Sequence, residues 1–297
     1  MQAVKIKLPR LLVYFLATLF LILSQVAYTI EVIDDEGNLV RLSQTVDRII
    51  SLAPSLTEII FAAGAGDKIV GVVEFSDFPP AARDITIVGR HDLLDLEAIL
   101  LLQPDLIVSW KTGNPAASIN RLREFGIPVY VAEPKQLKSI PIHIEKLGTL
   151  AGTMSIASGV IDGFNETLQK LETDFSNQSQ VSVFYQVWDT PLITAGGNEL
   201  INDIISLCGG ANLFVDILLV APKVDKESVL ARNPQIIIAS GMDIARPEWL
   251  DSWLEWPTLE AVTNGHLYFI PPDLVQRHTP RALQGAQLMC EQIDRAR

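Results

Sequence analysis

Short runs of β-branched and aliphatic residues alternate with amphipathic stretches along this chain. In the first half, the runs at 48–53, 69–73 and 127–132 have the character of buried strands. Between the first two runs, Ser55 and Glu58 have the spacing of a capping box, and the helix that they begin is expected to end at the GAG triplet. The order strand, helix, strand predicts parallel βαβ units.

The second half repeats this pattern, with strand-like runs at 181–188 and 266–271 and a helix through NDIISLC. Between the halves, segment 154–175 contains no strand signal, and its apolar residues recur at helical spacing: Ile156, Val160, Phe164, Leu168 and Leu171. The pattern predicts an α/β fold of two Rossmann-like lobes with parallel sheets, joined by one long rigid helix. The expected boundaries are 30–150 for the N-terminal lobe, 151–178 for the interlobe helix and 179–297 for the C-terminal lobe.

Two stretches of the chain resemble each other. In LEAILLLQPDLIVSW (96–110) and KESVLARNPQIIIAS (226–240), a glutamate stands seven residues before a proline, and a β-branched run follows. Proline cannot continue a helix, so each stretch reads as a helix followed by a strand. A helix, a proline and a strand in this order are common in α/β proteins. A carboxylate near a helix N-terminus is also favoured by the helix dipole alone. Two glutamates at equivalent places, Glu97 and Glu227, nevertheless predict a paired outward contact.

The N-terminus has the layout of a secretory signal. Lys5, Lys7 and Arg10 precede an uncharged run of 13 residues, 11–23, which is shorter than the roughly 20 residues that a spanning helix needs. Small residues around position 29 suit cleavage there. The segment around this position contains no cysteine, which disfavours a lipid-anchored lipoprotein. The sequence therefore predicts a signal peptide over 1–29 and a soluble exported protein, the alternative being an uncleaved anchor helix.

Composition indicates a folded protein with an acidic surface. Hydrophobic residues make up 48% of the chain and charged residues 20%, which excludes a disordered or fibrous chain. The net charge of −12 becomes −15 when the three basic residues of 1–29 are removed. Such a surface repels nucleic acid and suits a basic protein partner. Cys208 and Cys290 are the two cysteines, and an oxidising compartment favours a disulfide over two buried free thiols.

Catalytic motifs are absent from the sequence. It contains no nucleophile elbow, P-loop, zincin or kinase signature, and its four histidines (91, 143, 266 and 278) lack metal-ligand spacing. We therefore expect no enzyme, no metal site and no resident cofactor, but a ligand cleft between the lobes. Trp110 ends a predicted strand before a Lys-Thr-Gly-Asn turn, which places it to stack on a ligand or to lie partly buried beneath that loop.

Several segments in order resemble those of the vitamin B12-binding receptors of bacterial ABC importers, within the class of helical-backbone substrate-binding proteins. The segments are RIISLAPSLTEIIFAAG, FSDFPPAA, LEAILLLQPDLIVSWKTGN, LCGGANLF, ESVLARNPQIII and PPDLVQRHTPR. The resemblance covers most of the mature chain. It implies a periplasmic monomer whose two lobes move through a small hinge angle and capture a corrinoid between them for a membrane permease. Haem or a ferric siderophore on the same scaffold is the alternative, and an enzyme that uses the cleft is a remote one.

The resemblance also implies roles for individual residues. Glu97 and Glu227 match the glutamates that meet permease arginines, and Cys208 and Cys290 match the family's disulfide. Positions matching the ligand site are Phe75, His91, Trp110, Ile193, Ala221, Asp273, Leu274, Val275, Gln276 and Arg277. Of these, His91, Ile193 and Ala221 replace large aromatic residues, which predicts weaker stacking or a variant corrinoid. His91 either hydrogen-bonds a ligand amide or serves as an axial ligand of the corrinoid cobalt or haem iron.

Overall fold

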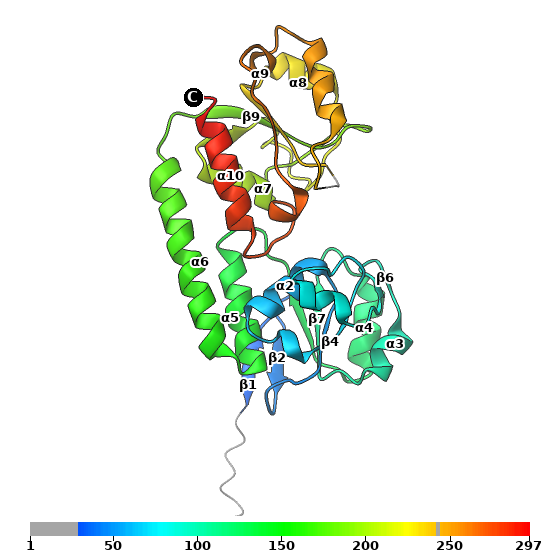
Figure 1. Cartoon of the computed structure of the whole chain (residues 1–297). Helices are drawn as coiled ribbons and strands as arrows, with labels where there is room; N and C mark the ends of the chain where they lie inside the picture. Colours follow the sequence, from blue (N-terminus) through cyan, green and yellow to red (C-terminus); the bar gives the residue numbers. More distant parts are fainter. Residues whose placement is uncertain (1–28, 242–243) are drawn as a thin grey trace, which may run out of the picture.

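The computed structural model describes residues 29–241 and 244–297. It contains two α/β lobes with separate sheets, connected by a long helix along one side of the molecule (Figure 1). The predicted signal segment 1–29 lies outside the described residues except for Thr29. Within the described ranges, no helix is long and apolar enough to cross a membrane.

The N-terminal lobe is built on a parallel sheet in the order β4–β3–β7–β8. Its strands are β3 (Ile49–Ser51), β4 (Ile69–Val72), β7 (Leu106–Trp110) and β8 (Val129–Ala132). The helices are α2 (Pro54–Ala62), α3 (Leu96–Leu101), α4 (Ala116–Glu124) and α5 (Ser139–Ala151), with 3₁₀ turns η1 (Gly66–Lys68) and η2 (Pro80–Asp84). Two hairpins flank the sheet: β1 (Ile30–Ile33) with β2 (Leu39–Leu42), and β5 (Gly89–Arg90) with β6 (Leu93–Leu94).

The C-terminal lobe has a mostly parallel sheet in the order β10–β9–β12–β13, and β11 also pairs with β9. Its strands are β9 (Val181–Trp188), the antiparallel β10 (Ile193–Thr194), β11 (Gly210–Asn212), β12 (Ile236–Ala239) and β13 (Leu267–Phe269). Its helices are α7 (Leu200–Leu207), α8 (Lys226–Arg232), α9 (Glu260–Thr263) and α10 (Ala282–Asp294), with 3₁₀ turns η3 (Glu248–Glu255) and η4 (Pro272–Leu274).

The long helix α6 (Met154–Phe175) connects the cores of the two lobes, and it buries three residues of the predicted apolar stripe, whereas Val160 is half-buried and Ile156 is exposed. Phe164, Leu168 and Leu171 are buried in one apolar cluster that includes one sheet face of each lobe together with α5 and α10. The opposite sheet faces pack in separate clusters, one in each lobe. Because close-packed interiors resist deformation, we expect this shared cluster to limit movement between the lobes to a small hinge angle.

The expected capping box at the start of α2 is wrong. The helix begins two residues earlier than this box predicts, with Ala53 as its N-cap and Pro54 in the first turn, and no side chain caps it. Proline suits that position because its φ angle is already helical and its missing N–H would have no partner there. Glu58 therefore does not cap the helix, and its carboxylate binds Arg277 and Arg281 of the other lobe.

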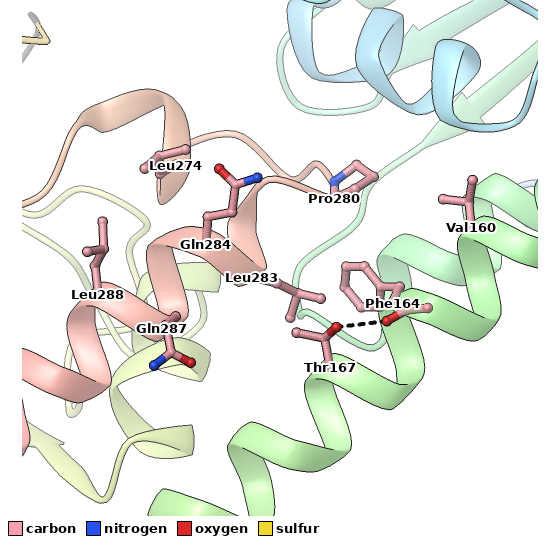
Figure 2. Close-up of a pocket in the computed structure, with 10 residues that line it drawn as sticks. Val160, Phe164, Thr167, Leu274, Pro280, Leu283, Gln284, Gln287 and Leu288 are labelled. Carbon is pink, nitrogen blue, oxygen red and sulfur yellow. Dashed lines mark hydrogen bonds between the residues drawn. The ribbon is translucent and has the colours of Figure 1, made fainter.

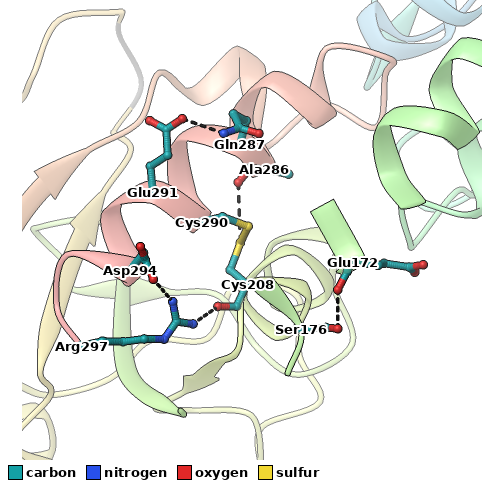
Figure 3. The surroundings of a disulfide bond; sticks show 9 residues. All are labelled: Glu172, Ser176, Cys208, Ala286, Gln287, Cys290, Glu291, Asp294 and Arg297. Carbon is teal, nitrogen blue, oxygen red and sulfur yellow. Dashed lines mark hydrogen bonds and ion pairs between the residues drawn. A yellow bond between two sulfur atoms is a disulfide. The ribbon is translucent and has the colours of Figure 1, made fainter. Parts of the chain in front are cut away.

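The disulfide that the sequence predicts joins Cys208, after α7, to Cys290 within α10 (Figure 3). Both cysteines are buried in the shared apolar cluster. Arg297 lies beside the bridge, where its Nη2 donates to the Cys208 carbonyl oxygen at 2.6 Å and its Nη1 pairs with Asp294. The cross-link spans 82 residues of sequence and fixes the last helix of the chain against α7.

Candidate functional site

A cavity of about 350 Å³ lies between the lobes. The N-terminal lobe contributes residues that follow the carboxyl ends of β3, β7 and β8, where ligands commonly bind in parallel α/β sheets. These are Ala53, Pro54, Ser55, Trp110, Thr112, Glu133, Pro134 and Lys135. The C-terminal lobe contributes Val187, Asn198, Glu199, Ile201, Val220, Ala221, Gln276, Arg277 and His278.

Trp110 is held at the edge of this cavity by its own loop. The Trp110 N–H donates to Asn114 Oδ1 at 2.6 Å, and Asn114 Nδ2 donates to the carbonyl oxygens of Leu52 and His91, both at 2.8 Å. The indole lies directly over Gly113, where a Cβ atom would stand 1.8 Å from a ring carbon. The Lys-Thr-Gly-Asn turn therefore fixes the position of the tryptophan, and its glycine leaves room for the ring.

The structure brings some of the expected ligand residues to the cavity and places others elsewhere. Trp110, Ala221, Gln276 and Arg277 line it. Phe75 is 73% exposed and has a φ of +66°, and the exposed His91 ring lies with its centroid 6.0 Å from that of Trp110. Neither Phe75 nor His91 belongs to the lining. The remaining positions also lie outside it: Ile193 is half-buried in β10, Asp273 contacts Arg277, and Val275 is fully buried in the core. Leu274 lines a separate groove between α6 and α10 (Figure 2).

An ionic cluster crosses from one lobe to the other beside the cavity. Glu58, only 4% exposed on α2, accepts hydrogen bonds from Arg281 Nε at 2.8 Å and Nη2 at 2.6 Å. Arg277 Nη1 reaches Asp77 at 3.0 Å and Glu58 at 3.3 Å, and its Nε reaches Asp273 at 3.1 Å. Burial alone would lower the pKa of Arg277, but these carboxylates raise it above its ordinary value. Arg277 therefore enters the cavity with its charge already compensated.

Two cavity residues, Glu199 and His278, escaped the sequence interpretation. Their side chains expose only 13% and 15%, and Glu199 Oε1 lies 3.6 Å from His278 Nε2. Burial raises the pKa of Glu199 to about 7, and burial lowers the pKa of His278 to about 4. Between these values both groups are neutral, so the contact is not an ion pair there. The sequence offered no signal because each residue stands alone in it, far from the other.

The other buried histidine, His143, belongs to a chain of hydrogen bonds beneath a neighbouring cavity. Tyr130 Oη lies 2.7 Å from His143 Nδ1, and His143 Nε2 lies 3.1 Å from Asp35 Oδ2. Burial raises the pKa of Asp35, but His143 and the Glu133 N–H outweigh it and bring the pKa below its ordinary value. Among residues 29–241 and 244–297, no group of His, Cys, Asp and Glu is arranged to hold a metal ion.

The two duplicated helices have the same local structure. Asp95 caps α3 by accepting from the Ala98 N–H at 3.0 Å, and Asp225 caps α8 by accepting from the Ser228 N–H at 2.6 Å. Glu97 and Glu227 follow in the first turns, and both are exposed. The helices end at left-handed residues just before the prolines, Gln103 (φ +47°) and Asn233 (φ +44°). Each lobe thus presents one glutamate in the same setting (α3 and α8 in Figure 1).

Residues 49–274 match the periplasmic binding protein family. The chain belongs to this family. The vitamin B12-binding protein of Vibrio cholerae is 37% identical over 245 residues, which cover 82% of this chain and 88% of that protein. The protein of the same name from Yersinia pestis is 32% identical over 251 residues, 84% of this chain and 88% of that one.

Solved structures share the fold. The crystal structure of the periplasmic vitamin B12-binding protein BtuF of V. cholerae superposes with a TM-score of 0.78 at 35% identity, covering 84% of this chain and 98% of that one. The periplasmic haem-binding protein HutB of V. cholerae superposes with a TM-score of 0.72 at 22% identity, covering 82% and 97%. The second likeness shows the fold alone.

Proposed function

We propose that this protein captures a corrinoid, vitamin B12 or a close variant, between its lobes and delivers it unchanged to the permease of an ABC importer. The observation that carries the proposal is the 37% identity, over most of both chains, to a protein named for vitamin B12. The interlobe cavity with Trp110 at its edge supports it, because a tryptophan face suits a large flat ligand. The function requires no chemical step and no resident cofactor.

The cavity dimensions bear on how such a ligand is seated. Pockets for drug-sized ligands hold about 300–1,000 Å³, and a corrinoid is larger than a typical drug. At about 350 Å³, the cavity of this conformation accepts one edge of the macrocycle, and deeper seating requires the lobes to move apart. In that case we expect the exposed ring of Phe75 and the His91–Trp110 pair to contact the outer part of the ligand.

The remaining parts of the proposal concern export and docking. Residues 1–29 direct export to the periplasm and are removed, leaving a monomer of two lobes, 30–150 and 179–297, with the connecting segment 151–178. Glu97 and Glu227 meet basic residues of the permease, one from each lobe, and their negative charges orient the receptor and speed encounter.

Haem is the second candidate, because solved haem-binding proteins share this fold. A retention assay separates the candidates: purified protein is incubated with cyanocobalamin, hemin or a ferric siderophore, passed through a desalting column, and followed by absorption and calorimetry. We expect retention of cyanocobalamin alone. Retention of hemin or the siderophore without cyanocobalamin would refute the proposal, and chemical turnover of any ligand would identify an enzyme.

His91 is tested in the same assay. We expect its imidazole to hydrogen-bond a ligand amide, so His91→Ala weakens corrinoid binding and leaves the visible absorption bands of the bound corrinoid unchanged. A change in the axial-ligand bands would instead assign His91 to the cobalt.

A further inference from the structure

The wall that the C-terminal lobe contributes to the cavity contains a buried acid and a buried imidazole in contact. Glu199 immediately precedes α7 and His278 lies between η4 and α10, so two distant segments bring these groups together. Both line the cavity, and their side chains are more than four-fifths buried. His278 Nε2 has no hydrogen-bond partner within the described part of the chain. Buried polar groups normally have partners, so this pair is suited to a polar group of the ligand.

The charges around the pair determine which polar group fits. Glu133 and Lys135 face Glu199 from the N-terminal lobe and have opposite effects on its pKa, Glu133 raising it and Lys135 lowering it. Arg277, the nearby guanidinium, is already bound to Glu58, Asp77 and Asp273. The positive charge of Arg277 is therefore already compensated and does not attract an anionic group of the ligand. An ionised Glu199 repels such a group.

We propose that Glu199 and His278 form a subsite that binds neutral carboxamide groups and rejects carboxylates. A primary carboxamide has both an N–H donor and a carbonyl acceptor, so it donates to the Glu199 carboxylate and accepts from the neutral imidazole of His278. A carboxylate has acceptors only. This inference deepens the proposed function and rests on it: corrinoids carry carboxamide side chains at their periphery, whereas haem carries carboxylates.

The preference for a carboxamide over a carboxylate is expected to depend on pH, because Glu199 changes its protonation state. Above about pH 7 Glu199 is ionised and repels a ligand carboxylate, whereas below that pH it is protonated and donates a hydrogen bond to one. His278, with a pKa of about 4, stays neutral across this range, and the nearby Tyr185 hydroxyl has a raised pKa and remains protonated. The preference for amide over acid therefore grows as the pH rises through about 7.

The test uses cyanocobalamin and its monocarboxylic acid derivatives, in each of which one side-chain carboxamide is replaced by a carboxylate. Dissociation constants are measured by calorimetry at about pH 6 and about pH 8, where a ligand carboxylate is ionised throughout because its ordinary pKa is about 4. We expect the ratio of the acid's constant to that of cyanocobalamin to rise at least about tenfold between the two pH values for one isomer. An unchanged ratio for every isomer would overturn the inference.

Variants assign the effect to the residue. Glu199→Gln keeps the size and hydrogen-bonding capacity of the side chain, so we expect the ratio to become independent of pH and the acid to bind more tightly at about pH 8. Glu145→Gln, which removes an exposed carboxylate from α5, is the charge-matched control and retains the rise. In Glu133→Gln the rise occurs at lower pH, because the carboxylate that raises the pKa of Glu199 is gone.

The outcomes distinguish this inference from the proposed function. Binding of cyanocobalamin by the wild type with no pH-dependent preference, or a preference that survives Glu199→Gln, overturns the carboxamide subsite and leaves corrinoid transport standing. Failure of the wild type to bind cyanocobalamin at either pH overturns both. The wild-type measurement needs no variant, so a folding defect in Glu199→Gln leaves the inference testable.

Discussion

At the scale of single residues, the site depends on contacts that sequence spacing does not reveal. The sequence predicted Trp110 as a ligand residue from its place at the end of a strand, and the structure puts it at the cavity. Gly113 and Asn114, three and four residues later, hold its ring and backbone in that place. Glu199 and His278 were not identified, because only the fold brings them within 3.6 Å of each other.

Gly113→Ala is expected to displace the Trp110 ring, because the new Cβ would lie 1.8 Å from a ring carbon. Since one well-placed aromatic contact contributes about 0.5–1.5 kcal/mol, we expect corrinoid affinity to fall about three- to tenfold. Calorimetry measures the affinity, and tryptophan fluorescence reports the movement of the ring. Gly159→Ala on α6 is the control, because nothing lies within 4 Å of the added atom. Equal affinity in the two variants would contradict the role given to Gly113.

Glu199 is expected to make stability depend on pH. Its folded-state pKa of about 7 lies above the ordinary 4.5, so the folded protein holds the proton more strongly. The favourable contribution is complete below about pH 4.5 and is lost as the pH rises to about 7, a change of up to about 3 kcal/mol. Urea denaturation across this range should show the fall as a difference between wild type and Glu199→Gln. His278 has the opposite effect on the pH dependence of stability, but it is present in both proteins, so its effect cancels in the comparison. A stability difference between wild type and Glu199→Gln that does not vary with pH would contradict this prediction.

At the scale of elements, the sequence predicted the main strands of both sheets and the helices α2, α3, α6, α7 and α8. It missed the helices α4, α5 and α9, the hairpins β1–β2 and β5–β6, and the short strands β10 and β11. The strands β5, β6, β10 and β11 are only two or three residues long, which is too short for a hydrophobic period to appear. They are fixed by pairing with neighbours, as β11 is by β9.

The duplicated helices α3 and α8 predict where a permease binds. Replacing Glu97 and Glu227 with alanine is expected to leave ligand affinity unchanged, because neither residue lines the interlobe cavity. Binding to the transporter should weaken, with a slower association rate and a smaller dependence on salt. Surface plasmon resonance against transporter in nanodiscs measures both. Glu145→Ala with Glu166→Ala removes the same charge from α5 and α6 as a control, and equal docking by the two double variants would refute the assignment.

At the scale of the whole molecule, two clusters hold the lobes together, in addition to a hydrogen bond from the Leu137 N–H to Asp203 Oδ2 at 2.8 Å. The shared apolar cluster around α6 joins their cores at one side, and the ionic cluster of Glu58 with Arg277 and Arg281 joins them beside the cavity. We expect the entry of a ligand larger than the cavity to separate this ionic cluster while α6 bends slightly.

Glu58→Gln is expected to weaken this ionic cluster. It leaves Arg281 half-paired at a site where its side chain is 16% exposed, and breaking one partner of a buried ion pair costs on the order of 3 kcal/mol. We expect lower stability in urea and a broader distribution of interlobe distances between spin labels, measured by electron paramagnetic resonance. Glu31→Gln breaks the exposed pair with Arg41 as a control, where a loss of about 0–1 kcal/mol is expected. An unchanged distance distribution in Glu58→Gln would show that the ionic cluster does not hold the lobes.

The sequence by itself determined the two α/β lobes, the connecting helix and the equivalence of Glu97 and Glu227, because hydrophobic period and helix-ending prolines are local properties of the chain. It placed Trp110 at a strand end for the same reason. Only the tertiary structure decided that Arg277 is bound by carboxylates from both lobes, that Val275 lies in the core, and that Glu199 and His278 share a cavity wall. Protonation and pairing depend on burial and on neighbours distant in sequence, and folding alone sets both.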